Sequence, residues 1–545
     1  MPATRDKIGA EALAFARFIT GLPRFLRQRV SFEQGRAIIQ QRLREREQNF
    51  LASIQQGIFA NPQSPYHAML ELAGCAYADL ERSVGERGLE GTLRMLRDAG
   101  VYVTFEEFKG RQPIVRSGRT IPAGERAFDN PDFRRYLGTS TGGSTGAGRR
   151  VNIDLTHMSA WLPHRALSRR FQGITGLPAA NWSNIPPAGG LTGQLMSVAL
   201  GGEPPRWFSV TDPSLSAGGL LRFKLATHAA LTVARLSGAR VRWPEYLPLD
   251  RAADLARWCR DRIKESGGCT VHGSVSRILR LAVAAQEAGI DLTGAVLRGG
   301  GEPPTHAKVA QITRTGAKFY SGYAYTEVGS VGTCCLNSKE PNDQHFWRDH
   351  LALIQAPRQV PGFDIEVSAF CFTTLLRTAP KLLLNVESDD YGIVDTTPCG
   401  CPWEELGLPE HIREIRSFRK LTGEGVTLIG SDMERILEEV LPGKFGGSML
   451  DYQLVEEEDE RGFTRLTLLV APGVTLPDEQ AAVEMVLQGL LGIGVVGDTS
   501  RNIWRQAGTV RVRREAPRLT SRGKLMPLQL ARQARKPMAS AGNGA

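Results

Sequence analysis

The stretch Gly294-Ala-Val-Leu-Arg-Gly-Gly-Gly-Glu-Pro-Pro304 decides the fold, together with Ala317-Lys-Phe-Tyr-Ser321 farther along. The first is a short apolar run ending in glycines, which predicts a buried strand followed by a tight turn. Residues 304–315 are typical of a helix that leads to the second strand. Upstream, Cys269-Thr-Val-His272 and residues 274–288 repeat the order of strand and helix. This alternation predicts an α/β fold with a mainly parallel sheet, whose binding loops lie at the carboxyl ends of the strands.

Weaker patterns extend this core in both directions. Further helices are expected at 36–51, 66–84, 87–98, 156–171 (capped by Thr156), 219–237, 251–264, 431–441 and 478–490. Strands are expected at 100–105, 151–155, 448–456 and 463–471, and the chain becomes rich in strands after about 350. The predicted organisation is a helical region at 1–100, a large domain at 101–416, a small mobile α+β domain at 417–536 and a disordered tail at 537–545.

Composition narrows the class of protein. The chain has 545 residues, too many for one core, and its 41% hydrophobic and 23% charged content is ordinary for a globular protein. No apolar run of membrane-spanning length and no secretory segment is evident, so we expect a cytoplasmic protein with reduced cysteines. The net charge of +10 is concentrated in residues 501–545. That stretch is either a solvated basic face or an attractor for a polyanion such as a nucleotide or coenzyme A. No nucleic-acid-binding pattern is present, so no nucleic-acid partner is expected.

A second informative stretch is Tyr136-Leu-Gly-Thr-Ser-Thr-Gly-Gly-Ser-Thr-Gly-Ala-Gly-Arg-Arg150. Ten of these residues are Gly, Ser or Thr, too small and polar to pack a core. Such a loop can direct backbone N–H and hydroxyl donors at an anion. The alternative interpretation is a flexible linker. The stretch has neither the Gly-Lys-Ser/Thr ending of a P-loop nor a dinucleotide-binding fingerprint.

Five features occur in order: this loop, Gly299-Gly-Gly-Glu-Pro303, Tyr320-Ser-Gly-Tyr-Ala-Tyr-Thr-Glu-Val-Gly329, Asn385-Val-Glu-Ser-Asp-Asp390, and Arg416 to Gly425 followed far downstream by Thr520-Ser-Arg-Gly-Lys524. In this order they resemble the adenylate-forming superfamily of acyl- and aryl-CoA ligases, firefly luciferase and peptide-synthetase adenylation domains. The phenylacetate–CoA ligase-like branch is the most similar. The resemblance covers roughly residues 100–530.

The resemblance implies a role for each matching residue. Gly142, Gly143, Ser144, Thr145 and Gly146, with Arg149, would hold the β- and γ-phosphates of ATP. Gly300, Gly301 and Glu302 would lie along the adenine, and Tyr323 and Tyr325 near the adenine or the acyl group. Thr326 would contact phosphate, Glu327 would bind Mg²⁺, and Asp390 and Arg416 would face the ribose. Gly425 would line the thiol tunnel, and Lys524 would bridge carboxylate and α-phosphate.

Three departures from the family pattern stand out. Gly148-Arg149 replaces the usual Pro-Lys, which keeps a cation but changes its geometry. Asn385 stands where the family usually has Arg, and Phe418-Arg419 stands at the hinge where this branch has Asp. The implied reaction is formation of an acyl-adenylate, rotation of the C-terminal unit, and transfer of the acyl group to a thiol.

The cysteines suggest a metal site. Cys399-Gly-Cys401 lies between prolines, and Cys334-Cys335 and His345 to His350 lie upstream. Three thiolates and one imidazole form a tetrahedral zinc set, for which we select Cys335, His345, Cys399 and Cys401, with Cys334 and His350 as substitutes. Similar sets occur in part of the phenylacetate–CoA ligase-like branch. Such a zinc would be structural, and the alternative is reduced thiols without metal.

The resulting functional hypothesis is an ATP- and Mg²⁺-dependent acid–thiol ligase whose acceptor is coenzyme A and whose acid is apolar or aromatic. Two alternatives stay open. An adenylating enzyme of a biosynthetic pathway could transfer the acyl group to a carrier protein or to an amine, with amide or N–N bond formation. A binding protein without catalysis could use the same fold.

Overall fold

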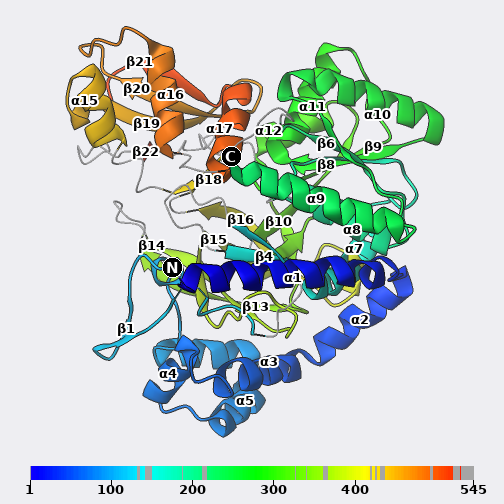
Figure 1. The fold of residues 1–545 in the computed structure, drawn as a ribbon, viewed down its shortest axis with the longest axis vertical. Coiled ribbons are helices and arrows are strands. Elements are labelled where there is room, and N and C mark those ends of the chain that lie inside the picture. Colours follow the sequence, from blue (N-terminus) through cyan, green and yellow to red (C-terminus); the bar gives the residue numbers. More distant parts are fainter. Residues whose placement is uncertain are drawn as a thin grey trace, which may run out of the picture.

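The computed structural model describes residues 2–124, 126–131, 136–140, 150–186, 188–211, 218–325, 327–338, 340–359, 366–417, 420–423, 426–429, 436–490, 495–518 and 528–529. The centre of the molecule is a twelve-stranded sheet with the strand order β13-β14-β15-β16-β12-β11-β10-β9-β8-β5-β6-β7. Helices cover it on both sides (Figure 1). The expected α/β class is therefore correct.

One half of this sheet is parallel, as the alternation of strands and helices predicts. It consists of β5 (Ala179–Trp182), β6 (Arg206–Ser209), β7 (Pro244–Tyr246), β8 (Cys269–Ser274), β9 (Ala295–Gly300) and β10 (Lys318–Tyr325). The other half is antiparallel and consists of β11 (Gly329–Thr333), β12 (Gln344–Phe346), β13 (Leu351–Gln359), β14 (Glu366–Thr374), β15 (Val386–Thr396) and β16 (Glu410–Ser417). The sheet is thus mixed, and the switch of direction between β10 and β11 lies beside the predicted site.

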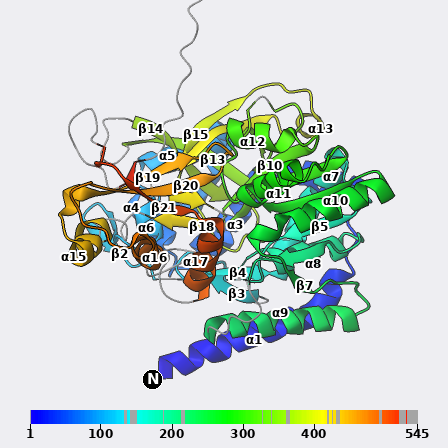
Figure 2. The same ribbon diagram turned by 90° about the horizontal axis from the view of Figure 1, so that it is seen from above.

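Two groups of helices enclose the parallel strands. The side chains of Val271, Leu297 and Phe319 point to α10 (Ala252–Ser266) and α11 (Val275–Glu287) and share one core with them, beside α12 (His306–Thr313). The opposite face turns toward a second core, built by α1 (Pro2–Leu26), α2 (Phe32–Arg44), α7 (Leu155–Phe171), α8 (Gly190–Ala199) and α9 (Gly218–Leu236). Helices α1 and α9 lie side by side along this outer layer (Figure 2).

The N-terminal region is helical, as expected, with one correction. It contains α2, α3 (Arg46–Ile54), a π-helical turn η1 (Gln55–Phe59), α4 (Pro65–Leu72), α5 (Tyr77–Asp98) and α6 (Phe105–Phe108), followed by the hairpin of β1 (Ile114–Arg116) and β2 (Arg119–Ile121). The expected strand at 100–105 is wrong. Only Val103 forms a bridge, to Val386, and Thr104 then caps α6 with its side chain. The expected helix at 66–84 is divided between α4 and the first part of α5, and α5 continues through a kink at Gly88 to Asp98, where the expected helix at 87–98 ends.

The Gly/Ser/Thr loop is framed by a hairpin of β3 (Tyr136–Ser140) and β4 (Arg150–Asp154), in which Ser140 is opposite Arg150. The residues between them, 141–149, lie outside the described part of the chain. Helix α7 follows β4 directly. Its cap is Asp154, whose carboxylate accepts from the backbone N–H of Thr156 and His157 at 2.6 and 3.4 Å. Thr156 is therefore not the cap that the sequence predicted.

The C-terminal region forms a separate small sheet with the order β21-β20-β19-β22. The elements of the C-terminal region, in chain order, are β17 (Lys420–Gly423), β18 (Val426–Ile429), η3 (Ile436–Val440), α15 (Leu441–Phe445), β19 (Tyr452–Glu458), β20 (Thr464–Val470), α16 (Glu479–Leu490), α17 (Val495–Ala507), β21 (Val510–Arg514) and β22 (Leu528–Gln529). Strands β19 and β20 pair antiparallel, as expected. The boundaries of the predicted domains stay a prediction.

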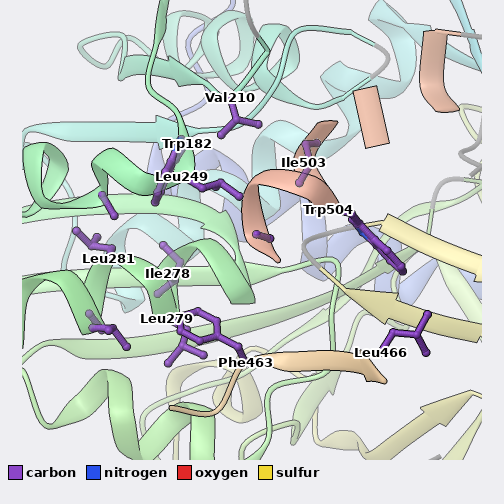
Figure 3. Close-up of a cluster of buried hydrophobic side chains, with 14 of the residues drawn as sticks. Trp182, Val210, Leu249, Ile278, Leu279, Leu281, Phe463, Leu466, Ile503 and Trp504 are labelled. Atoms are coloured by element: carbon purple, nitrogen blue, oxygen red, sulfur yellow. The ribbon is translucent and has the colours of Figure 1, made fainter. Parts of the chain in front are cut away.

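This small sheet packs on the large one through apolar side chains. Trp504 and Ile503 of α17 and Phe463 beside β20 belong to the same buried cluster as Leu249 and Leu279 (Figure 3). At the edge of this contact, Lys308 Nζ donates to Thr464 Oγ1 at 2.8 Å. Among the described residues, no helix is both long and apolar enough to cross a membrane.

Candidate functional site

Several predicted residues lie where the parallel strands end. Strand β9 ends at Gly300, β10 ends at Tyr325, and the carboxyl ends of parallel strands are where such folds bind ligands. Gly301 has φ 76°, a left-handed conformation that favours glycine and turns the chain away from β9. The glycine run therefore leaves exposed backbone at this edge of the sheet.

Asp390 is the centre of a hydrogen-bonded group at this edge. Tyr323 Oη donates to its Oδ2 at 2.8 Å, and Ser417 Oγ also donates to this carboxylate. The three residues come from β10, β15 and the end of β16, where Asp390 and Ser417 are opposite each other. Burial, followed by the Asp390 charge, raises the pKa of Tyr323 well above its usual value, so the phenol stays a donor. Ser417 was not predicted, because its partner is 27 residues away on another strand.

Glu327 is buried two residues beyond β10. Its carboxylate accepts from Lys109 Nζ at 2.6 Å. Burial, followed by the charges of Glu327 and Asp390, raises the pKa of Tyr325 well above its usual value, which places the three side chains in one electrostatic environment. Lys109 follows α6, and no pattern in the sequence connects it with Glu327. The pairing is the main feature of the site that sequence reasoning missed.

Two other predicted residues lie differently. The buried Glu302 carboxylate accepts from Ser276 Oγ and from the Ser276 backbone N–H, the latter at 3.4 Å, at the start of α11. Its side chain thus fixes the glycine loop to a helix N-terminus, where a negative charge is favourable. The Arg416 guanidinium is more than half exposed and lies 3.5 Å from Glu414, at the rim of the Asp390 group.

The remaining predicted ATP-site residues lie outside the described part of the chain. They are Gly142, Gly143, Ser144, Thr145, Gly146, Arg149, Thr326, Gly425 and Lys524. Their roles stay predictions.

The four selected metal ligands come together. One ligand atom from each of Cys335, His345, Cys399 and Cys401 lies within 4.8 Å of the others. His345 Nε2 is 3.4 Å from Cys399 Sγ and 3.1 Å from Cys401 Sγ. A hydrogen bond with Cys401 lowers the pKa of the Cys335 thiol, so the cluster favours a thiolate. Three sulfurs and one imidazole nitrogen at this spacing match the donor set of a structural zinc site.

Neighbouring groups orient these ligands. His345 Nδ1 is 2.8 Å from the carbonyl oxygen of Leu408, which fixes the proton on Nδ1 and leaves Nε2 free to coordinate. The Glu404 carboxylate accepts from the backbone N–H of Cys399 and Gly400 at 2.8 and 2.7 Å. Gly400, with φ 64°, provides the turn between the two cysteines. His345 and Cys399 are therefore each held by a second contact.

The substitute ligands lie elsewhere. Cys334 Sγ accepts from the backbone N–H of Ser321 at 2.9 Å, and burial raises the pKa of the thiol to about 11. His350 belongs to another buried group, in which Asp349 Oδ1 lies 2.8 Å from His164 Nε2 and 3.2 Å from His350 Nδ1. A cavity of about 20 Å³, room for one water, lies beside these imidazoles and Trp161. No sequence pattern predicted this group.

Comparison with known proteins finds no matching family model and no similar curated protein. The similar solved structures include CoA ligases, a CoA synthetase, an amide bond synthetase and an adenylation domain.

Three of these solved structures illustrate how far the similarity to this chain extends. A 2-hydroxyisobutyryl-CoA ligase in the postadenylation state is 17% identical over 93% of this chain and 91% of its own, with a TM-score of 0.42. An o-succinylbenzoate CoA synthetase mutant from Bacillus subtilis is 13% identical, over 72% and 67%, with a TM-score of 0.38. An amide bond synthetase mutant from Marinactinospora thermotolerans is 14% identical, over 85% and 91%, with a TM-score of 0.38. At these values the similarity by itself assigns neither activity nor substrate.

Proposed function

We propose that this chain is an enzyme that uses ATP to activate a carboxylic acid as its acyl-adenylate and then transfers the acyl group to a thiol, that of coenzyme A. The observation that carries the proposal is the buried Asp390–Tyr323–Ser417 group, next to Glu327 and the glycine end of β9. These residues offer hydrogen-bond acceptors for a ribose and a carboxylate for a divalent cation at one sheet edge. The order of the sequence features gives the proposal its chemistry.

Asp390 is suited to accept hydrogen bonds from the ribose hydroxyls. A carboxylate has about four acceptor positions, so donors from Tyr323 and Ser417 can orient it without saturating it. Tyr323 lies on β10 and Ser417 at the end of β16, the partner of β15, so two separate strands donate to the carboxylate and orient it. This orientation would make Asp390 a fixed reference point for the nucleotide.

Glu327 would hold Mg²⁺, an ion that prefers carboxylate and phosphate oxygens. The ion would supply neutralisation of phosphate charge. Lys109 Nζ, at 2.6 Å from Glu327, pairs with this buried carboxylate and holds it in place. The residues present therefore fit the ion.

In the proposed first step, a carboxylate oxygen of the acid attacks the α-phosphorus, the bond to the bridging oxygen breaks, and pyrophosphate leaves. Positioning and charge neutralisation dominate such phosphoryl chemistry, and Lys524 would supply the mobile cation. In the second step the thiol loses its proton, its sulfur attacks the acyl carbon, and AMP leaves.

The cysteine and histidine cluster would hold a structural zinc ion. Four protein ligands leave no open coordination position, so a role in the reaction is not part of the proposal. The ligands connect the segment after β11 with the loop between β15 and α13 (Pro402–Glu405).

The direct test is acid-dependent exchange of labelled pyrophosphate into ATP, measured across aromatic, fatty, amino and dicarboxylic acids. Exchange with one class would support activation of the acid. A complete lack of exchange with properly folded protein would reject it. Mass spectrometry of products formed with coenzyme A, a carrier protein or amines would then identify the acceptor, and a product with amine alone would replace the thiol with the amine alternative.

A further inference from the structure

One face of the parallel sheet carries a row of polar side chains beneath the proposed site. Asn181, His272, Arg298 and Tyr320 are direct register neighbours on β5, β8, β9 and β10. Neighbours in register point to the same face of a sheet. The residues that alternate with them, such as Val271 and Leu297, point into the apolar core on the other side. Strands that are buried on both faces usually carry apolar residues throughout, so a row of four polar side chains on one face indicates a role other than core packing.

Helix α7 adds two cations to the row. Arg165 and Arg169 are four residues apart and so lie on the same face of the helix. Burial, followed by the nearby charge of Arg165, lowers the pKa of Arg298 to about 10, and Arg169 contributes in the same direction. Burial, followed by Arg169, also lowers the pKa of Arg165. The three guanidinium groups therefore form one cluster of like charge, named here the arginine cluster.

No carboxylate balances this cluster among the residues that the structure describes. None of its three half-buried arginines forms an ion pair there, whereas the buried Arg46 pairs with Glu90 and the half-buried Arg116 pairs with Glu107. Like charges held near one another without an anion are electrostatically unfavourable. The arrangement is that of a site prepared for a negatively charged ligand.

Two neighbouring residues differ in how accessible they are. Tyr320 is 3% exposed, and its buried hydroxyl has no hydrogen-bond partner among the described residues. His272 is exposed, and desolvation, followed by the charges of Arg298 and Arg165, lowers its pKa. The row of polar side chains is therefore accessible at His272 and closed at Tyr320. At neutral pH this imidazole is uncharged and can donate a hydrogen bond.

The position of Arg298 relates the cluster to the active site. Arg298 precedes Gly300 by two residues on β9 and faces the same side of the sheet, roughly 7 Å farther from the carboxyl end of the strand. A ligand that reaches from the strand end toward the cluster therefore needs an anionic group a few atoms from its reacting carboxylate.

We infer that the acid activated by this chain carries a second anionic group, an oxyanion that Arg298 and Arg165 bind with Tyr320 as a further donor. Arg169 adds charge behind them. Guanidinium groups recognise carboxylate, phosphate and sulfonate oxygens through paired N–H donors. This inference rests on the proposed function and replaces the purely apolar or aromatic acid expected from the sequence with an acidic one.

The experiment compares matched acids and matched variants. Exchange is measured with α,ω-dicarboxylates of increasing length, their monomethyl esters, and analogues whose distal group is a phosphonate or sulfonate. We expect the exchange activity to reach a maximum at one chain length of the dicarboxylate. The kcat/KM for the diacid should be at least about tenfold higher than for its ester. The best of the three distal anions then identifies the chemical class of the native group. Arg298→Met should remove the preference by lowering kcat/KM for the diacid about 10- to 100-fold while changing the ester less than about threefold.

Three controls keep the interpretation unambiguous. Arg240→Met, which removes a guanidinium exposed at the surface, should leave both substrates unchanged. Arg298→Lys keeps the charge but loses the paired donors and should give an intermediate preference. If either Arg298 variant unfolds, as judged by its melting curve, Arg165→Met provides the same test from α7.

Direct binding separates this inference from the proposed function. Titration calorimetry of the full chain with the diacid, without ATP, should show binding that Arg298→Met abolishes. If no acid supports exchange but this binding is found, the anion site is supported and the activation proposal falls. If monoacids exchange as well as diacids and Arg298→Met changes neither, activation stands and the inference is overturned. The inference would also be overturned if pyrophosphate or coenzyme A bound at the arginine cluster without competing with the diacid or the monoacid.

Discussion

At the scale of single residues, the candidate site depends on how two buried carboxylates are oriented. Asp390 receives two hydroxyl donors, and Glu327 has an ammonium partner. The difference suits their proposed roles, because ribose hydroxyls need acceptor oxygens in a fixed position, whereas a divalent cation needs a negatively charged ligand. Tyr323 and Ser417 are positioning residues, since they act through Asp390.

Replacing Asp390 by Asn tests this arrangement. The amide keeps one acceptor but loses the negative charge and presents donors toward Tyr323 and Ser417. We expect KM for ATP in the exchange reaction to rise about 10- to 100-fold, in line with the loss of a hydrogen bond to a charged group. Ser417→Ala should change KM for ATP less than Asp390→Asn does. An unchanged KM for ATP in Asp390→Asn would remove Asp390 from the nucleotide site.

At the scale of elements, the turn Cys399-Gly400-Cys401 connects two distant parts of the large sheet through its metal-ligand geometry. Zinc binding would couple to folding here, because the four ligands come from separate segments. We expect purified protein to contain about one zinc per chain, and removal of the ion by a chelator to lower the melting temperature. Cys399→Ser should reduce the zinc content, whereas Cys75→Ser, at an unrelated cysteine, should not. Metal-free protein with an unchanged melting curve would contradict the prediction.

The β19–β20 hairpin has a pH-dependent element at its contact with α12. Burial raises the pKa of Glu456 to about 7, while nearby Lys308 lowers it and Glu458 raises it. The folded state therefore binds this proton more tightly than the unfolded state, in which the pKa is about 4.3. The penalty for ionising Glu456 is absent below that value, grows as pH rises from about 4.3 to 7, and is constant above 7.

Replacing Glu456 by Gln should remove this penalty. We expect the variant to be more stable than the unmodified chain by about 1–3 kcal/mol at pH 8 and equally stable near pH 4.5. Denaturant titrations at several pH values measure the difference. A difference that stays constant across this range would show that Glu456 does not titrate as described.

The β8–β10 part of the parallel half was predictable, because strands 269–274, 295–300 and 318–325 alternate with helices and the first two have glycines at their carboxyl ends. The antiparallel half was foreseen only as a region rich in strands. Pairings such as β12 with β16 join residues far apart in the chain, and local patterns do not encode them. Val101 and Val103 mimicked a strand since both are buried, although one bridge at Val103 is all that forms.

Sequence motifs predicted some residues of the candidate site. The residues that lie in no motif, and that only the fold brings to the site, could not be predicted. Tyr323, Glu327, Asp390 and the four metal ligands were named from motifs or spacing. Lys109 and Arg298 were not, because each is one ordinary cation in its own segment. Only the packing of α6 near β10, and the register of β8, β9 and β10, gives these cations their neighbours.

At the scale of the whole molecule, the proposed cycle requires the C-terminal unit to change position between the two half-reactions. Lys524→Ala tests the assignment of the mobile cation. We expect exchange to fall by at least about a hundredfold, since the cation acts where negative charge develops, while thioester formation from supplied acyl-adenylate continues. Exchange at the unmodified rate would assign that role to another residue.

Trp504 connects the position of the C-terminal unit with an optical signal. Its indole is fully buried in the cluster that this unit shares with the large sheet (Figure 3). Rotation of the unit would bring the ring from an apolar surrounding into water, and indole emission moves to longer wavelength in a polar surrounding. Stopped-flow fluorescence after addition of acid and ATP should then show a red shift that Trp504→Phe abolishes. The chain would carry its own probe of the step between its two reactions, read without any label.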